Sequence, residues 1–468
     1  MQPGADVPVA ESGLSYAAGE RGMQRMQLRY GFNEIDGWPA FSMGEDREEI
    51  YRRLRLLDTK VIRIFVFDKP VPDPFKEWPW FAALVQGVLD CGAKPMVTFA
   101  KFKPPHDNAS NIRKFVARST EIVWSCLEHW GGEEVKDWFW CVWNEPNNPD
   151  VGGDLRYKDY LRIYQELAAP VLELLEPHAA GTKVKLGGPS IDGTQRAYWM
   201  DWIAQFVSDV DERMLGFVNW HMYADWRPAV PHDTTRVKLV NEPDAPNGRV
   251  FEALAMAQTA QYEARARGVG RLLAGRDILN VCGELNTIAH HDDSFTQGLN
   301  RNVFGAAYYA SAIVNLIRGG AHLEMRWTAT SKRWNAVDDA YGLMSVHGEP
   351  TAACLAKQLF AQHVRYGDWI QFPDIETAHP GIDAIIARND AGRRSAVLVN
   401  TLPRTQSLDV SRWAGGLGGG GLGGCSDALR LDSGTGGRIV RERCRGSVRI
   451  EGYGLAVVTD DSAETVVD

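Results

Sequence analysis

Several classes of protein are excluded by what this sequence lacks. The net charge of −9 over 468 residues leaves no excess of Lys and Arg for binding a phosphate backbone. No stretch reaches the roughly 20 apolar residues of a membrane span, because the apolar run 304–317 is too short and contains Asn315. We therefore expect no nucleic acid and no membrane among the partners of the chain.

Signals for secretion and for a zinc site are also missing. Residues 1–6 show no basic and then apolar segment, which favours a cytoplasmic location unless a signal has been removed. The seven cysteines form no CxxC pair or other spacing typical of zinc ligands. Their odd, scattered set favours buried free thiols, and a Cys425–Cys444 disulfide is the alternative. We expect neither a metal nor an organic cofactor.

The composition that remains is that of a soluble globular protein. Apolar residues make up 44% and charged residues 24% of the chain. The 16 tryptophans exceed what core packing normally uses, and their flat faces could stack on sugar rings or simply pack. Composition therefore leaves a sugar-binding function open without predicting it.

Strand-like and helix-like segments alternate up to about residue 364. Eight segments have the apolar, β-branched and aromatic content of buried strands: residues 28–33, 61–67, 95–100, 138–144, 183–188, 217–223, 278–284 and 322–328. Helical patterns lie between them, for example at residues 46–57, 80–91, 111–130, 157–175 and 251–267. This alternation predicts a parallel TIM (β/α)8 barrel over residues 28–364. A doubly wound open sheet is the alternative, but no glycine-rich phosphate turn follows the first strand.

Beyond the expected barrel the pattern changes to short strands separated by Gly, Asp and Pro turns. These strands, at residues 382–387, 395–400, 448–450 and 454–459, predict an antiparallel β-sandwich domain over residues 365–468. Residues 1–27 could add an edge strand to it. The glycine-rich stretch 414–424 contains a formal GxGxxG, but no strand precedes it and no helix follows, so we expect a surface loop.

Two glutamates stand at the ends of expected strands. Glu145 follows the apolar run 138–143, and Glu284 follows the apolar run 278–283. Because catalytic groups of a parallel barrel sit at the carboxyl ends of its strands, strands four and seven would bring both carboxylates to one mouth. The alternative is that each is an ordinary surface glutamate at the start of a loop.

Paired carboxylates at one mouth fit the chemistry of glycoside hydrolysis. Cleavage of an acetal needs a carboxylic acid that protonates the leaving oxygen. It also needs a carboxylate that attacks the anomeric carbon or activates water. Glu145 and Glu284 therefore predict a glycosidase site.

The sequence around both glutamates resembles the motifs of clan A retaining glycoside hydrolases. The run 143–147, Trp-Asn-Glu-Pro-Asn, looks like the acid/base motif, and its last Asn is typical of glycoside hydrolase family 39, which includes β-xylosidases and α-L-iduronidases. The run 284–287, Glu-Leu-Asn-Thr, is similar to the nucleophile motif of that family. Further similar stretches lie at residues 187–189, 221–223, 341–344 and 348–350. The resemblance spans residues 28–364 and implies a TIM barrel.

One position departs from the family pattern. Xylosidases of the family carry an Arg-Phe-His stretch in the second strand, where this chain has Arg63-Ile64-Phe65. This chain therefore has Phe65, and no sugar-binding histidine, at this position.

The resemblance implies a role for each residue of the expected site. Glu145 would be general acid and then general base, with a pKa raised by an apolar setting. Glu284 would be the nucleophile, kept ionised by hydrogen bonds from Arg63 and Tyr223. Asn144 would donate to the 2-hydroxyl group of the sugar. A structural ion pair for Arg63 and a core phenol for Tyr223 are the alternatives.

Further residues are expected to line the substrate. By the same resemblance His221 would contact the sugar, and Trp327, in the eighth strand, would form the floor beneath it, unless it only packs in the barrel. His106 follows the third strand and would line a distal sugar subsite or simply form a turn.

For two groups of charged side chains the sequence predicts a function less specifically. The run 290–293, His-His-Asp-Asp, could be read as metal ligands, but adjacent histidines point apart in most backbones, so a loop beside the substrate is favoured. Cations after strands three and eight could recognise a uronate carboxylate or simply be solvated. They are Lys101, Lys103, Arg326, Lys332 and Arg333.

The sequence as a whole predicts a retaining glycoside hydrolase that acts on an oligosaccharide or other glycoside. An inactive carbohydrate-binding protein of the same fold and a transglycosylase that uses the same residues are the alternatives. The sugar, the linkage, exo or endo action and the oligomeric state depend on loops that one sequence does not specify.

Overall fold

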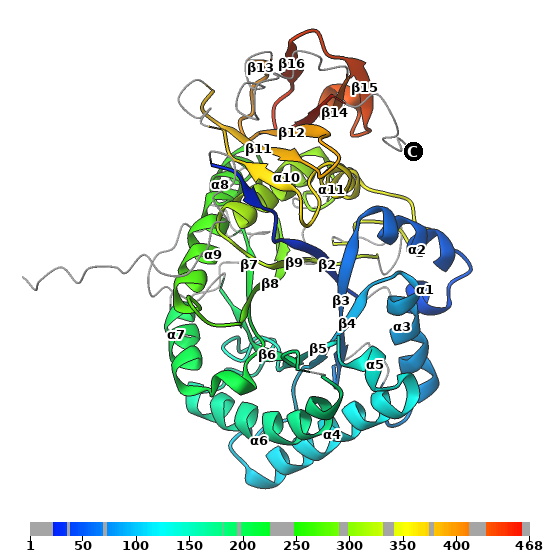
Figure 1. The fold of residues 1–468 in the computed structure, drawn as a ribbon, viewed down its shortest axis with the longest axis vertical. Helices are drawn as coiled ribbons and strands as arrows, with labels where there is room; N and C mark the ends of the chain where they lie inside the picture. Colours follow the sequence, from blue (N-terminus) through cyan, green and yellow to red (C-terminus); the bar gives the residue numbers. More distant parts are fainter. Residues whose placement is uncertain are drawn as a thin grey trace, which may run out of the picture.

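The fold was determined from a computed structural model of the chain (Figure 1). The structure describes residues 22–34, 38–68, 73–179, 181–193, 198–224, 248–289, 298–330, 341–373, 379–410 and 427–460.

Eight parallel strands form a closed barrel, which confirms the predicted TIM barrel. In order around the barrel they are β2 (Arg29–Asn33), β3 (Thr59–Val66), β4 (Lys94–Phe99), β5 (Phe139–Val142), β6 (Lys185–Asp192), β7 (Phe217–Tyr223), β8 (Leu279–Asn286) and β9 (Leu323–Trp327). Figure 1 shows this ring of strands enclosed by helices. Every expected strand corresponds to one of the eight, with its bounds shifted by a few residues.

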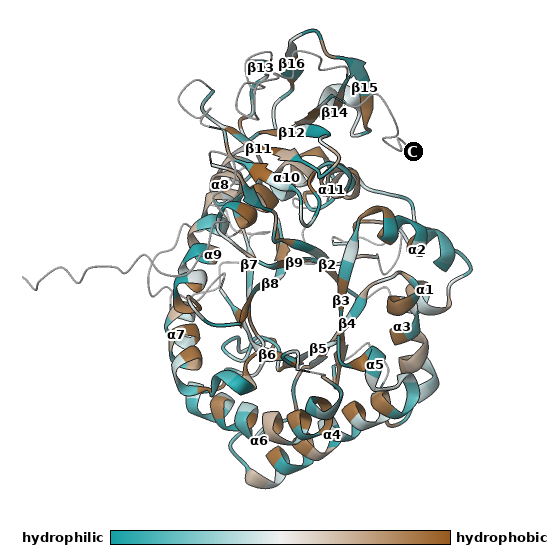
Figure 2. Cartoon of the chain, in the orientation of Figure 1, coloured by the Kyte–Doolittle hydropathy of each residue, from teal (hydrophilic) through white to brown (hydrophobic). Residues whose placement is uncertain are grey.

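Helices cover the outside of the barrel. They are α1 (Trp38–Met43), α2 (Arg47–Leu56), α3 (Trp78–Asp90), α4 (Ala109–Trp130), α5 (Gly132–Val135), α6 (Tyr157–Leu175), α7 (Trp199–Asp209), α8 (Gly248–Ala257), α9 (Ala260–Leu272), α10 (Val303–Arg318) and α11 (Ala352–His363). Short 3-10 turns are η1 (Glu176–His178), η2 (Glu212–Met214) and, beyond the barrel, η4 (Ser433–Thr435). Hydrophobic and hydrophilic residues alternate along these helices, as expected when one face packs on the strands (Figure 2). None of the described helices is both long and apolar enough to cross a membrane.

One expected helix is divided in two. The pattern at residues 251–267 predicted a single helix, but α8 ends at Ala257 and α9 begins at Ala260. Between them, the Thr259 hydroxyl donates to the Met256 carbonyl at 2.8 Å and lies 2.8 Å from the Ser311 hydroxyl of α10. A threonine side chain that binds nearby backbone competes with helix continuation, which explains the break.

Apolar side chains fill the interior of the barrel below its carboxyl end. The cluster consists of Val61, Met96, Phe139, Cys141, Phe217, Val281, Leu323 and Met325. Because side chains alternate along a strand, Arg63 lies on the same face as Val61, one step nearer the carboxyl end. The interior therefore changes from apolar to polar toward the strand ends.

A second sheet, entirely antiparallel, packs beside the barrel at α10 and α11 (Figure 1). In spatial order its strands are β1 (Gln24–Arg25), β10 (Trp369–Gln371), β11 (Ile382–Arg388), β12 (Arg394–Asn400), β17 (Leu455–Thr459), β14 (Asp427–Leu431) and β15 (Val440–Arg443). A two-stranded sheet is made of β13 (Gln406–Asp409) and β16 (Ser447–Ile450). This confirms an antiparallel β-domain beside the barrel, while the bounds 28–364 and 365–468 stay a prediction.

The cysteines of the described residues are free and buried: Cys91, Cys126, Cys141, Cys282, Cys354 and Cys444. Cys425 and the glycine-rich stretch 414–424 lie outside the described residues.

Candidate active site

Glu145 is held by an unusual turn that follows β5. Trp143 and Glu145 both adopt left-handed backbone angles, with φ of 75° and 47°, a conformation that side chains with a Cβ rarely adopt. The Glu145 N–H donates to the Ser190 carbonyl at 2.8 Å, and the Trp143 indole donates to the Gly152 carbonyl at 3.0 Å. A Cβ on Gly152 would lie 1.9 Å from the Glu145 carbonyl oxygen. Only glycine lets the following loop close over the turn and hold it.

Glu284 reaches the interior because β8 contains a bulge. The register of β8 shifts at Gly283, so that His221 pairs with Glu284 instead of Gly283. A Cβ on Gly283 would lie 1.9 Å from the Asn219 side chain, which occupies that space. A bulge turns the next side chain toward the opposite face. Glu284 is therefore part of a strand that continues to Asn286, whereas the sequence predicted a strand ending at residue 284.

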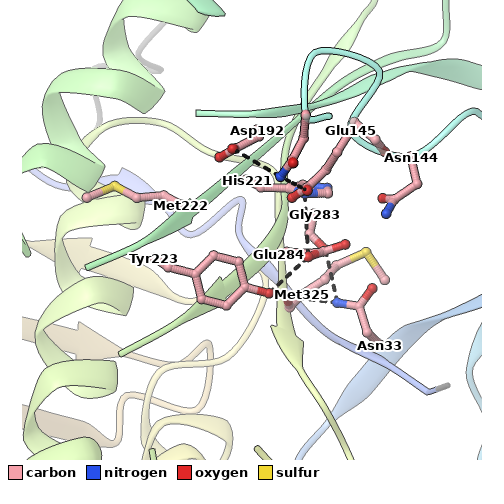
Figure 3. Close-up of polar contacts among 12 residues, drawn as sticks. Asn33, Asn144, Glu145, Asp192, His221, Met222, Tyr223, Gly283, Glu284 and Met325 are labelled. Carbon is pink, nitrogen blue, oxygen red and sulfur yellow. Dashed lines mark hydrogen bonds and ion pairs between the residues drawn. The ribbon is translucent and has the colours of Figure 1, made fainter. Parts of the chain in front are cut away.

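The two glutamates lie close together and are almost fully buried (Figure 3). One carboxylate oxygen of Glu145, one of Glu284 and a ring nitrogen of His221 all lie within 4.8 Å of one another. His221 Nδ1 is 2.8 Å from Glu145 Oε1 and 3.5 Å from Glu284 Oε2. The strand ends thus bring residues from distant parts of the chain into one cluster.

The hydrogen-bond partners of His221 favour one tautomer of its ring. Arg63 Nη1 lies 3.5 Å from Nε2, and a guanidinium can only donate. Nδ1 then carries the hydrogen and donates it to Glu145 Oε1. Burial lowers the pKa of His221 to about 4, so the ring is neutral near pH 7.

Arg63 links the groups of the site. Its guanidinium is fully buried and donates to Glu284 Oε1 at 2.7 Å and to Asn144 Oδ1 at 2.7 Å. Further hydrogen bonds join it to Thr98, Ser190 and Asn33. With its carbonyl oxygen occupied by Arg63, Asn144 has its Nδ2 amide left to donate to a ligand.

Tyr223 supplies a second donor to Glu284. Its hydroxyl donates to Glu284 Oε2 at 2.9 Å, as Figure 3 shows. Arg63 and Tyr223 therefore occupy one oxygen each of the Glu284 carboxylate. This arrangement fixes the carboxylate and favours its ionised form.

Burial acts on both carboxyl groups in the same direction. It raises the pKa of Glu145, and the charge of Asp192 raises it further, against an opposing hydrogen bond from Asn148. Burial also raises the pKa of Glu284, against the opposing effects of His221 and Arg63. The pKa of Glu284 is thus above its ordinary value, which we did not expect from the sequence. Because Arg63 pairs directly with Glu284, a single shared proton belongs on Glu145.

Two further residues, Trp327 and His106, were expected to contact the substrate. Trp327, half-buried at the end of β9, meets Phe65 edge-on at 5.7 Å between ring centroids. His106 lies behind Trp143, with 5.6 Å between ring centroids, and its Nε2 is 3.0 Å from the Phe102 carbonyl oxygen. His106 thus packs against the turn of Glu145 and has no polar contact with either glutamate among the described residues.

Two of the cations expected in loops after strands three and eight have partners within the protein. Lys101 donates to the Val151 carbonyl at 2.9 Å and pairs with Asp68 at 3.4 Å. Arg326 does not follow the eighth strand but lies within β9, fully buried, with its guanidinium 4.5 Å from the centre of the Tyr309 ring of α10. Lys332, Arg333 and the run 290–293 lie outside the described residues.

Three polar residues of the site were missed in the sequence. Asn33 ends β2 and donates to the Gly283 carbonyl at 3.0 Å. Asn148 and Asp192 lie beside Glu145. Asn33 ends the first expected strand, and the carboxyl end of a barrel strand is a position that could have identified it as a site residue. Asp192 gave no such signal, because the expected fifth strand ended at residue 188, before the bulged end of β6.

Comparisons with known proteins find matches to one family of glycoside hydrolases. The model of glycosyl hydrolases family 39 matches residues 73–237, which include Glu145 and His221. A β-xylosidase of Geobacillus stearothermophilus is 32% identical over 175 residues, which cover 33% of this chain and 32% of that protein. A β-xylosidase of Caldicellulosiruptor saccharolyticus is 22% identical over 285 residues, or 60% of this chain and 51% of that protein. The chain thus matches about a third of the length of the first of these curated relatives and about half of the second.

Solved structures share the fold over nearly the whole chain. A family 39 β-xylosidase from Caulobacter crescentus superposes with a TM-score of 0.60 and 14% identity, covering 94% of this chain and 98% of that one. At this identity the similarity shows the architecture and not the activity. The sequence matches relate the chain to glycoside hydrolase family 39, and the family model covers a region that includes Glu145 and ends before Glu284.

Proposed function

We propose that this protein is a retaining glycoside hydrolase, with Glu284 as nucleophile and Glu145 as general acid and base. The observation that carries the proposal is the spacing of the two glutamates, which have carboxylate oxygens within 4.8 Å of each other. Retaining enzymes hold their carboxyl groups about 5–5.5 Å apart, whereas inverting enzymes need roughly 6.5–9.5 Å to admit a water. The spacing supports direct attack by a carboxylate.

The first step would form a covalent glycosyl-enzyme. A Glu284 oxygen attacks the anomeric carbon while the bond to the leaving oxygen breaks, and the proton of Glu145 moves to that oxygen. The raised pKa of Glu145 supports this role, because a general acid must hold its proton near the working pH. Arg63 and Tyr223 would orient the attacking carboxylate.

The second step would release the sugar with its configuration retained. Glu145, now a carboxylate, takes a proton from water, and the resulting hydroxide attacks the anomeric carbon and displaces Glu284. Asn144 would donate to the 2-hydroxyl group in both transition states, since Arg63 fixes its amide. We expect His221 to act through Glu145, with which it shares a hydrogen bond, rather than through the sugar.

The substrate is proposed from the chemistry of the site and from the names of the relatives. Both curated relatives are β-xylosidases, which makes aryl β-xylosides the first substrates to test. Trp327, half-buried at the end of β9, presents aromatic surface, which suits the apolar face of a sugar ring. A transglycosylase would use the same two steps with a sugar hydroxyl in place of water.

A panel of aryl glycosides tests the proposal. It covers xylose, glucose, galactose, arabinose and uronic acids, and the anomer first released is identified by proton NMR. We expect turnover of at least one sugar with a product of the same anomeric configuration as the substrate. Release of the opposite anomer would contradict the retaining mechanism. Binding of sugars without any release of aglycone would favour an inactive carbohydrate-binding protein.

A further inference from the structure

Two polar side chains lie on the side of Glu145 away from Glu284. Asn148 Nδ2 donates to Glu145 Oε2 at 2.8 Å and to Asp192 Oδ2 at 3.4 Å. One amide group thus joins two carboxyl groups, because an NH2 group has two hydrogens to donate. Asp192 is 5% exposed, and Figure 3 shows it beside Glu145. A second buried acid therefore stands directly behind the proposed general acid.

This arrangement is built into the backbone. Asn147, fully buried, accepts from the Asp192 N–H at 2.9 Å and donates to the Asp192 carbonyl at 2.8 Å. The Asn148 N–H donates to the Glu145 carbonyl at 2.9 Å, and the Asn148 carbonyl accepts from the Gly152 N–H at 2.9 Å. The turn that carries Glu145 is thus fixed to the end of β6, which carries Asp192.

Asn148 and Asp192 act on Glu145 in opposite directions. The negative charge of Asp192 opposes a second negative charge on Glu145 and so favours its protonated form. An N–H donated by Asn148 to Oε2 favours the ionised form. The pKa of Glu145 responds in this way, raised by Asp192 and lowered by Asn148.

Other charged groups also face Glu145. Arg63 on β3 and Lys101 after β4 lower its pKa. Glu284 on β8 lies within 4.8 Å, and His221 on β7 is neutral near pH 7. Asp192 is therefore the acid near Glu145 that is left unassigned by the two-step mechanism.

We propose that Asn148 and Asp192 are positioning residues that control when Glu145 releases its proton. Asp192 keeps the proton on Glu145 until the leaving oxygen takes it, and Asn148 stabilises the carboxylate that remains. The inference rests on the proposed function, in which Glu145 is the acid of the first step and the base of the second. Neither residue exchanges a proton with the substrate.

The test is the pH profile of kcat/KM for an aryl glycoside with a poor leaving group, whose alkaline limb reports the ionisation of Glu145. Asp192→Asn should move this limb to lower pH, and Asn148→Leu should move it to higher pH, each on the order of one pH unit. Asp192→Glu, which keeps the charge, should leave the limb near its wild-type position. Glu173→Gln removes an exposed charge near the C-terminal end of α6, at the end of the barrel opposite to the site, and should leave the limb unchanged.

Opposite shifts separate this inference from a merely structural role. General loosening of the turn would lower the rate or move both limbs in one direction, and either result overturns the proposal. If Asp192→Asn does not fold, as judged by circular dichroism, the upward shift in Asn148→Leu decides alone. Wild-type protein that turns over no glycoside would contradict the proposed function. An active wild type whose variants show unchanged limbs would contradict only this inference.

Discussion

At the scale of single residues, the two glutamates differ in what surrounds them. Glu284 has a cation and a phenol on its two oxygens, whereas Glu145 has a neutral imidazole and an amide. A carboxylate beside Arg63 is suited to hold a negative charge, and a carboxyl group without a directly paired cation is suited to hold a proton. Different environments give two identical side chains different roles.

Removal of each carboxylate should give a different kinetic result. Glu284→Ala should abolish turnover of every glycoside, because no covalent intermediate can form. Glu145→Ala should still form the intermediate from dinitrophenyl glycosides, which need little protonation, but should hydrolyse it slowly. Added azide needs no general base and should restore turnover of Glu145→Ala, giving a β-glycosyl azide if the substrate is a β-glycoside.

Two outcomes would contradict these assignments. If azide rescues Glu284→Ala with a product of retained configuration and leaves Glu145→Ala inactive, the roles of the glutamates are exchanged, because only a variant that lacks the acid/base still passes through the covalent intermediate. If both variants keep wild-type rates, the site lies elsewhere.

Arg63 should not be replaceable by lysine. The guanidinium donates to Glu284 and Asn144 at once, and one ammonium group cannot reproduce that planar arrangement. We expect Arg63→Lys to lower kcat by about 10²-fold, similar to the loss of one transition-state donor in other enzymes. Arg52→Lys on α2, an exposed ion pair with Glu49, is the control and should leave kcat unchanged. Steady-state kinetics on the best aryl glycoside measure both.

At the scale of elements, the sequence predicted where the site lies but not how its residues are turned inward. The apolar runs before Glu145 and Glu284 identified the strands, because buried parallel strands need β-branched and aromatic residues. The bulge at Gly283 depends on the Asn219 side chain of a neighbouring strand, which no local pattern reveals. Asp192, the second partner of Asn148, likewise comes from β6, 44 residues away.

The turn after β5 should be sensitive to a single methyl group. Gly152→Ala would place a Cβ 1.9 Å from the Glu145 carbonyl oxygen and so displace the turn. A displacement of about 1 Å in a catalytic group can lower the rate by about 10²-fold, and we expect a fall of that order in kcat.

A second glycine provides the matched control. Gly270 lies in α9, and a Cβ there meets no atom within 4 Å. Gly270→Ala should therefore keep wild-type kcat and stabilise the protein by roughly 0.5–1 kcal/mol through helix propensity. Equal kinetics in both alanine variants would show that the loop does not position Glu145.

At the scale of the whole molecule, buried charges hold the barrel to its last helix. Lys357 of α11 is fully buried and donates to Glu324 of β9 at 2.6 Å and to the Gly31 carbonyl of β2 at 2.9 Å. A second set of polar contacts joins α10 to the antiparallel sheet. Ser311 and Asn315 of α10 donate to Asp383 of β11. The barrel and the sheet therefore share an interface of specific polar contacts.

Loss of the buried lysine should destabilise the protein strongly. Lys357→Met would leave the Glu324 carboxylate buried without its cation, which typically destabilises by about 3–5 kcal/mol. Lys357→Met combined with Glu324→Leu removes both charges and should recover much of that loss. The free energy of unfolding is measured by denaturant titration with far-UV circular dichroism. Similar stability of the single and double variants would contradict this description.

The overall architecture was predictable from the sequence because it depends on repeated local patterns. Eight alternating units predict a barrel, and short strands between Gly and Pro turns predict an antiparallel sheet. An edge strand from residues 1–27 was expected and is present as β1, but the order of the other strands was not predictable, since β17 pairs with both β12 and β14. Such pairings depend on contacts between distant segments, which local sequence does not specify.

Trapping of the covalent intermediate tests the central claim most directly. A 2-deoxy-2-fluoro glycoside of the preferred sugar with a dinitrophenyl leaving group slows both steps, but its good leaving group lets the intermediate accumulate. Peptide mass spectrometry then locates the attached sugar. The account predicts a single adduct on Glu284, slow return of activity as the sugar is released, and no adduct in Glu284→Ala. An adduct on Glu145 or on another residue, or complete turnover to the inverted anomer without any adduct, would contradict it.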